Sequence, residues 1–116
     1  MAPVTLPDHD SERCRVIRDT FARISDKWSL LVIVTLSHGP LRFTALKLGL
    51  EGISQRMLTL TLRRLEADGL IRRTVYAEVP PRVEYELTDS GRSLIAPVTA
   101  LADWAVEHHA ALEAVH

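Results

Sequence analysis

The sequence predicts a small α+β domain that is mostly α-helical. Its 116 residues suit a single domain, and 47% apolar with 25% charged residues is the composition of a globular protein. Apolar residues recur at helical spacing along most of the chain, whereas between residues 70 and 87 they alternate as in a β-hairpin. We therefore expect a loose tail over residues 1–10 and one domain over residues 11–116.

Two helices are expected at the start of this domain. Ser11 is a good N-cap for the first helix, which carries one apolar stripe: Cys14, Ile17, Phe21 and Ile24. Ser25-Asp26 offers a cap for the second helix. That segment is apolar nearly all round until the stop at Gly39-Pro40, which predicts a buried central helix.

A pair of shorter helices should follow. Residues 41–43 look extended, and Thr44 can cap a brief helix that ends at the turn over residues 49–52. Ser54 is the next N-cap, and a helix over about 54–67 follows, with Gly69 suited to the left-handed residue after its end. Its inward stripe is Leu58, Leu62 and Leu65.

The last third of the chain predicts a hairpin and a long helix. The hairpin covers about 70–87, with a proline-containing tip, and the helix covers about 89–113. Spacings of alternately four and three residues along this helix form a heptad-like seam, in which Pro97 should introduce a bend. The seam includes Leu94, Val98, Leu101 and Ala105.

The net charge of −1 conceals a basic middle section. Residues 42–82 hold eight basic and four acidic side chains, whereas residues 83–116 hold one basic and six acidic. A helix–turn–helix followed at once by a hairpin is the winged helix-turn-helix arrangement, whose second helix enters the major groove of DNA. Together these observations favour double-stranded DNA as the partner.

The helix over 54–67 is the expected recognition helix, because its outward side carries groups that read base edges. Gln suits adenine, Arg suits guanine, and Thr suits bases or the thymine methyl group. Leu60 also points away from the inward stripe, toward thymine methyl groups or the short preceding helix. Ser54 marks a helix N-terminus that can bind phosphate. The predicted DNA contacts are Ser54, Gln55, Arg56, Thr59 and Arg63, with Arg42, Arg72, Arg73 and Arg82 beside them.

The chain resembles the HxlR-type transcriptional regulators, a winged-helix family related to the MarR type. The resemblance covers about residues 14–106, and its motifs are specific in combination. Leu60 departs from the family, where this position is more often polar. The matching segments include Lys27-Trp28, Arg42-Phe43, Gly52-Ile53-Ser54, Leu65-Glu66-Ala67-Asp68-Gly69-Leu70 and Pro80-Pro81-Arg82-Val83-Glu84-Tyr85.

This resemblance implies a homodimer held by the N- and C-terminal helices and bound to an inverted-repeat operator. In a two-fold dimer the half-sites would be centred about 34 Å apart. The alternative is that both apolar stripes pack only within their own subunit. The expected interface residues are Ile17, Phe21, Ile24, Leu94, Val98, Leu101, Trp104 and Ala105.

Cys14 is the single cysteine, so it cannot form an internal disulfide. Several relatives sense oxidants or electrophiles through an early cysteine, and the resemblance carries this role to Cys14. A place near a helix N-terminus beside arginines favours a reactive thiolate. Its place on the apolar stripe instead favours an inert core residue.

Other function classes have weaker support in the sequence. There is no phosphate-binding loop and no spaced catalytic set, so we expect no enzyme activity, no metal and no cofactor. No segment suggests a membrane span or a signal peptide, which predicts a cytoplasmic protein. Two alternatives stay open: a winged helix that binds protein instead of DNA, and a regulator with a small-molecule pocket near Phe21, Trp28 and Trp104.

Overall fold

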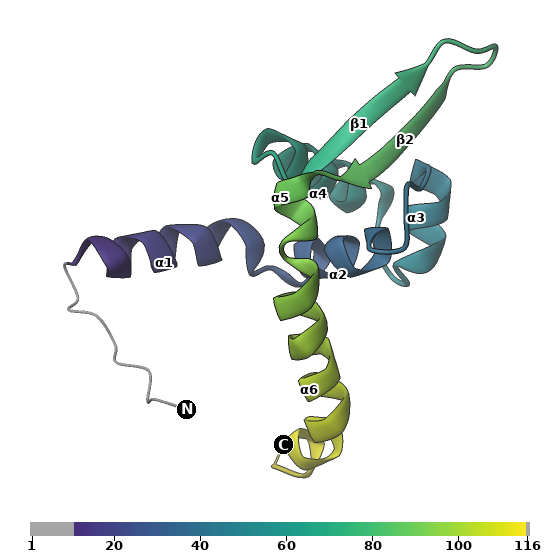
Figure 1. Cartoon of the computed structure of the whole chain (residues 1–116). Coiled ribbons are helices and arrows are strands. Elements are labelled where there is room, and N and C mark those ends of the chain that lie inside the picture. Colours follow the sequence, from purple (N-terminus) through teal and green to yellow (C-terminus); the bar gives the residue numbers. More distant parts are fainter. Residues whose placement is uncertain (1–10, 116) are drawn as a thin grey trace.

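The computed structural model describes residues 11–115, and the tail expected over residues 1–10 lies outside this range. It confirms the mostly helical α+β class, with six helices and one two-stranded antiparallel sheet in the described residues. The elements are α1 (Glu12–Ile24), α2 (Lys27–Leu36), α3 (Phe43–Gly49), α4 (Gln55–Ala67), β1 (Ile71–Tyr76), β2 (Arg82–Leu87), α5 (Asp89–Arg92) and α6 (Ile95–Val115) (Figure 1).

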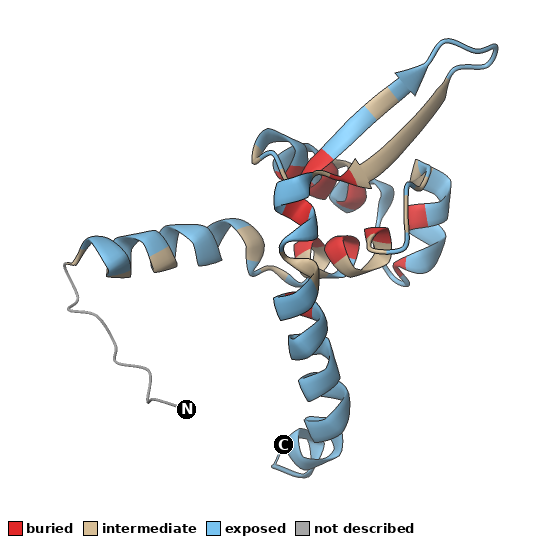
Figure 2. Cartoon of the chain, in the orientation of Figure 1, coloured by how far each residue is buried: buried red, intermediate tan, exposed pale blue. Residues whose placement is uncertain are grey.

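The core lies where α2, α3 and α4 pack against the base of the hairpin, and Figure 2 shows the buried residues gathered there. Leu41 joins this body by pairing with Tyr85 of β2, with backbone N···O distances of 2.9 and 2.8 Å. The buried cluster comprises Val32, Ile33, Leu36, Leu46, Leu50, Ile53, Leu58, Leu62, Leu65, Ile71 and Leu87.

Helix α4 has well-defined ends. At its start the Ser54 hydroxyl oxygen accepts a hydrogen bond from the Met57 amide at 3.0 Å, which confirms the expected N-cap. At its end Gly69 has φ of +74°, and the amide of Leu70 donates to the carbonyl of Leu65 at 2.9 Å. This bond, together with the positive φ of Gly69, is the pattern of a Schellman motif. Glycine suits this position because it tolerates positive φ.

The hairpin projects from the body as a two-stranded wing (Figure 1). Its register pairs Ile71 with Leu87 at the base and Tyr76 with Arg82 near the tip. Because Ile71 and Leu87 are both buried in the core cluster, the base is anchored while the tip extends into solvent. The wing in this article means residues 71–87.

The backbone of α5 lies very close to the backbone at the start of the wing. The Thr88 hydroxyl donates to the Gly69 carbonyl at 2.6 Å and caps α5 by accepting from the Gly91 amide at 3.2 Å. Gly91 is buried, and a Cβ atom there would overlap the carbonyl oxygen of Leu70. Glycine at this position therefore lets α5 lie directly against the chain that enters β1.

Two helices, which we call the arms, leave the body: α1 on one side and α6 on another (Figure 1). Helix α1 has no buried residue, and α6 buries only Val98. The exposed surface of both arms stands out in Figure 2. The arms contrast with α2 and α4, each of which buries several side chains.

Three details of the expected elements differ in the structure. The single helix expected at the end of the chain is divided into two, because the chain turns at Ser93 and Leu94 between α5 and α6. Pro97 lies in the first turn of α6, where a missing amide breaks no helical hydrogen bond, so it does not interrupt the helix. Helix α3 begins at Phe43 after Arg42, without the predicted cap from Thr44.

Candidate nucleic-acid interface

The outward face of α4 carries two arginines with no ion pair. The side chains of Arg56 and Arg63 are exposed and form no hydrogen bond or salt bridge with any other residue in the 11–115 range. Both border a shallow hollow of about 540 Å³ on this face. Their guanidinium groups are therefore available to an external acceptor. The hollow is lined by Gln55, Arg56, Thr59, Leu60 and Arg63.

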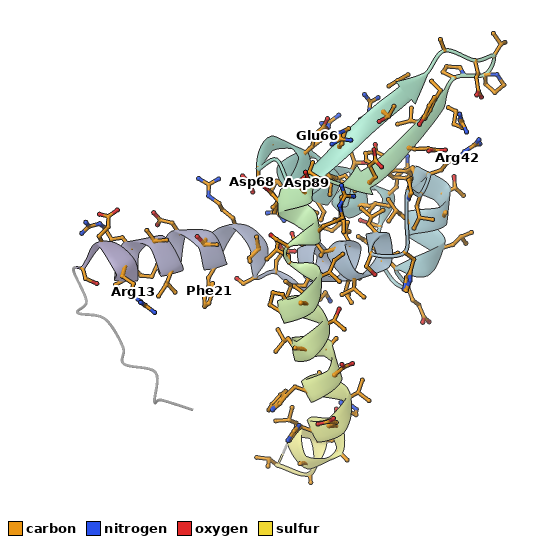
Figure 3. All side chains as sticks on the ribbon, viewed as in Figure 1. Arg13, Phe21, Arg42, Glu66, Asp68 and Asp89 are labelled. Atoms are coloured by element: carbon orange, nitrogen blue, oxygen red, sulfur yellow. The ribbon has the colours of Figure 1, made fainter. Side chains whose placement is uncertain are left out.

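The polar residues of this face differ in what they can offer. The Thr59 hydroxyl donates to the Gln55 carbonyl at 2.9 Å, so it has no hydrogen left to donate to a base. At the start of the helix the Ser54 side chain satisfies only one of the first amides, and the others remain open to a phosphate. Glu66 and the C-cap residue Asp68, both labelled in Figure 3, place carboxylates at the opposite end of the helix.

Arg64, on the other side of α4, is not part of this free surface. Its guanidinium donates to the Asp26 carboxylate at 3.3 Å, while Asp26 caps α2 by accepting from the amide and hydroxyl of Ser29 at 2.9 and 2.7 Å. Partial burial acts to raise the pKa of Asp26, but the bonds from Ser29 and the charge of Arg64 together hold that pKa below its usual value. Arg64 thus ties the recognition helix to the start of α2.

A second ion pair joins the far end of α4 to an arm. Arg23 of α1 donates to the Asp68 carboxylate at 2.7 Å. Asp68 is the C-cap residue of α4, so the end of the recognition helix and the end of α1 are held together. This ion pair links the end of α4 to the base of α1, a helix that contributes no residue to the core cluster.

The wing arginines are mostly engaged within the wing. Arg72 pairs with Glu86 across the strands at 3.2 Å. Arg82 pairs with Glu78 and Glu84 at 3.2 Å each and lies over the Tyr76 ring at 4.0 Å. The wing holds three arginines and three glutamates, so it is close to neutral.

Two predicted DNA contacts beside α4 stay unpaired. Arg73 of β1 and Arg42 are exposed, and their side chains form no ion pair or hydrogen bond with the rest of the described chain. Figure 3 shows Arg42 extending on the side of the hairpin. These two arginines, like Arg56 and Arg63 on the face of α4, are thus predicted DNA contacts whose side chains the fold leaves open to phosphate.

The arm residues predicted for the dimer fall into two groups. Val98 is only 7% exposed and helps line an apolar groove between α2 and α6, and Leu94 packs against the core, so both are used within the subunit. The Phe21, Leu101 and Trp104 side chains are about half exposed or more. Ala105 is exposed as well, and Ile17 and Ile24 are half-buried. Figure 3 shows Phe21 pointing from α1 toward the side on which α6 extends.

Cys14 is partly exposed and is the third residue of α1, with its amide bonded to the Ser11 hydroxyl at 3.1 Å. Phe21, Trp28 and Trp104 do not line the apolar hollows beside α1 and α6 of the single subunit, and the alternative of a small-molecule pocket between the helices of a dimer stays a prediction. No three metal-binding side chains gather among residues 11–115. No helix in that range combines the length and apolarity needed to cross a bilayer.

Comparison with known proteins places this geometry in a family. The sequence profile of the HxlR-like helix-turn-helix family matches residues 23–113. The chain belongs to this family. It is 54% identical over 81 residues to an HTH-type transcriptional regulator of Methanothermobacter thermautotrophicus, a match that covers 70% of this chain and 62% of that relative. It is 45% identical over 92 residues to the HTH-type transcriptional regulator YtcD of Bacillus subtilis, covering 79% of this chain and 73% of YtcD.

The HxlR assignment extends to the solved structures. The reduced form of the redox regulator HypR superposes with a TM-score of 0.80 at 39% identity, covering 85% of this chain and 98% of HypR. The winged helix-turn-helix fold and the family resemblance are therefore confirmed. The protein is a DNA-binding transcriptional regulator of the HxlR type, not an enzyme.

Proposed function

We propose that this HxlR-type regulator binds an inverted-repeat operator as a homodimer, with one α4 helix in the major groove of each half-site. The observation that carries the proposal is the pair of unpaired arginines, Arg56 and Arg63, around the hollow on the outward face of α4. Arginine reads guanine bidentately in the major groove, and Gln55 on the same face suits adenine.

In this arrangement the phosphate contacts come from groups that the fold leaves free. The first turn of α4 after Ser54, Arg42 and Arg73 hold the backbone and so set the register. Arg72 and Arg82 belong to the internal ion pairs of the wing and contribute little to DNA affinity.

The arms support the dimer. A subunit alone leaves Phe21, Leu101 and Trp104 largely in solvent, and covering such a surface with a second copy is favourable. The arms are also complementary in charge, because α1 carries four arginines against two acids, whereas α6 carries three acids and no arginine or lysine. We infer that α1 of one subunit contacts α6 of the other.

Selection from a random duplex pool at near-physiological salt tests the operator. We expect an enriched inverted repeat with half-sites centred about 34 Å apart. The Arg56→Ala/Arg63→Ala double variant should enrich no sequence, while Arg72→Ala, the matched control, should enrich the wild-type repeat. An unenriched wild-type pool would overturn the proposal and favour a winged helix that binds protein.

Sedimentation equilibrium tests the dimer. The wild type should sediment as a dimer at micromolar concentration, and Phe21→Ala/Trp104→Ala should shift toward monomer with its helical content retained. Val79→Ala, at a fully exposed apolar residue on the wing, is the control and should stay dimeric. A wild type that is monomeric at all concentrations would show that the two stripes serve only their own subunit.

We also propose that Cys14 is the oxidant sensor, a role favoured by its partly exposed place near the N-terminus of α1 and by the likeness to a redox regulator. Two Cys14 thiols of a dimer would be oxidised by hydrogen peroxide to one disulfide, with two waters formed. This bridge requires Cα atoms within about 7 Å of each other.

Operator binding before and after peroxide treatment tests the sensor. Oxidised wild type should run as a cross-linked dimer in a non-reducing gel and should change its operator affinity, with both effects reversed by dithiothreitol. Cys14→Ser should bind like the reduced wild type under both conditions. If peroxide changes the affinity of Cys14→Ser equally, Cys14 is not the sensor.

A further inference from the structure

We propose that Leu60 is a specificity-determining residue that reads the C5 methyl group of a thymine in each half-site. This inference rests on the proposed placement of α4 in the major groove and adds a contact that the polar residues of α4 cannot supply.

Leu60 lies at the centre of the outward face of α4. At about 100° per residue it is turned roughly 200° from Leu58, which is fully buried in the core. Its side chain is 47% exposed and borders the hollow between the arginines. Leu60 is thus on the outward side of α4, in one row with Arg56 four residues before it and Arg63 three residues after it.

Leu60 lies outside the core cluster of the described residues. The other residues that line the hollow are Gln55, Arg56, Thr59 and Arg63, which all carry polar groups. The exposed half of Leu60 is therefore an apolar surface among polar side chains, and it is open to a partner.

The chemistry of the hollow selects the partner. The Thr59 hydroxyl gives its hydrogen to the Gln55 carbonyl, so the side-chain donors around the hollow are those of Gln55, Arg56 and Arg63. In the major groove the thymine methyl group is the apolar feature of the base edges. The isobutyl side chain of Leu60 therefore suits the thymine methyl group of an A·T pair. The guanidinium groups of Arg56 and Arg63 on either side suit neighbouring base pairs that accept hydrogen bonds.

Replacement of single thymines by deoxyuridine tests the contact, because it removes only the methyl group. In the selected operator each half-site thymine is replaced in turn, and affinity is measured by fluorescence anisotropy. Loss of one buried methyl group should weaken wild-type binding about fourfold at one position and not at the others. Leu60→Ala should bind the thymine and deoxyuridine operators equally.

Leu48→Ala is the matched control, since Leu48 on α3 is 81% exposed and lies outside the hollow. It should keep the fourfold discrimination, and thermal unfolding should show that both variants fold. The inference is overturned if wild type ignores the methyl group at every thymine, if the half-site has no A·T pair, or if Leu60→Ala still discriminates. Failure of the operator selection itself would instead refute the placement of α4.

Discussion

The recognition helix and the wing both carry arginines, but the fold treats them differently. On α4, Arg56 and Arg63 have no carboxylate partner in the described structure, whereas on the wing Arg72 and Arg82 are each held by glutamates. Positive charge counted along a sequence is therefore a poor measure of the positive charge that DNA can meet. The difference supports the proposal that α4 reads the operator and that the paired wing arginines have a largely structural role.

The largest expected effect comes from exchanging an unpaired arginine for alanine and comparing it with a paired one. Arg63→Ala should weaken operator binding by about 1–3 kcal/mol and relax the base preference at one position, because a bidentate base contact is lost. Arg72→Ala should change affinity by much less. Anisotropy titrations on the operator and on single-base variants measure both, and equal losses for the two variants would end the distinction.

Arg64 extends the comparison, because it is a paired arginine on the recognition helix itself. Its partner Asp26 caps α2, so Asp26→Ala should destabilise the fold by about 1 kcal/mol through the lost cap. Asp26→Asn keeps a capping side chain and loses only the charge. Urea unfolding at pH 7 should place the Asn variant between wild type and the Ala variant.

The pH dependence of this pair follows from the lowered pKa of Asp26. A carboxyl group whose folded-state pKa is depressed stabilises the fold above its ordinary pKa of about 3.9, and this contribution is lost as the pH falls through the lower value. The stability gap between wild type and Asp26→Asn should therefore close below about pH 4. A gap that widens on acidification would contradict the assignment.

Salt dependence separates the unpaired wing arginine from the paired ones. Arg73→Ala should lower the slope of log affinity against log salt by about 1, and it should weaken all DNA sequences alike, as expected for a phosphate contact. Arg72→Ala should leave the slope nearly unchanged. Identical slopes for Arg73→Ala and wild type would show that the wing does not contact the backbone.

The smallest expected effect is a gain. Glu86→Gln removes the carboxylate that holds Arg72 at 3.2 Å. Surface ion pairs contribute less than about 1 kcal/mol, so release of Arg72 should tighten DNA binding by no more than about fivefold. The double variant Glu86→Gln/Arg72→Ala should lose this gain. Unchanged affinity for Glu86→Gln would show that Arg72 stays out of reach of DNA even when it is free.

Sequence patterns predicted the geometry of α4 well, because its inward and outward sides follow from helical period alone. Leu58, Leu62 and Leu65 are buried, and Arg56 and Arg63 face outward, as expected. Whether each of these side chains faces inward or outward depends only on neighbours three or four residues away, so a short stretch of sequence is enough to predict it.

The wing shows what the sequence pattern missed. A basic window that ends at residue 82 leaves out Glu84 and Glu86, yet Glu84 pairs with Arg82 on the same strand and Glu86 pairs with Arg72 across the hairpin. The signal was available: once the strand ends are known, the antiparallel register places residue 72 opposite residue 86. Charges on a hairpin must be counted after the strands are paired.

The sequence pattern also could not predict which apolar side chains of the arms are buried within the subunit, for another reason. Val98 and Leu101 belong to the same seam, but Val98 is buried against α2, whereas Leu101 is 54% exposed. A heptad pattern reports that a surface is apolar and does not say which molecule covers it. The point at which α6 leaves the body decides which of these side chains is buried and which is exposed. That point depends on the turn at Ser93 and Leu94.

The contact at Gly91 has a geometric consequence for the operator. Helix α6 has 21 residues and works as a lever roughly 30 Å long, whose base is set where α5 touches the Leu70 carbonyl. A tilt of about 10° at that base would move its far end by roughly 5 Å, more than the rise of one base pair. In the proposed dimer, joined through this arm, the close contact at Gly91 would therefore influence the number of base pairs between the two half-sites.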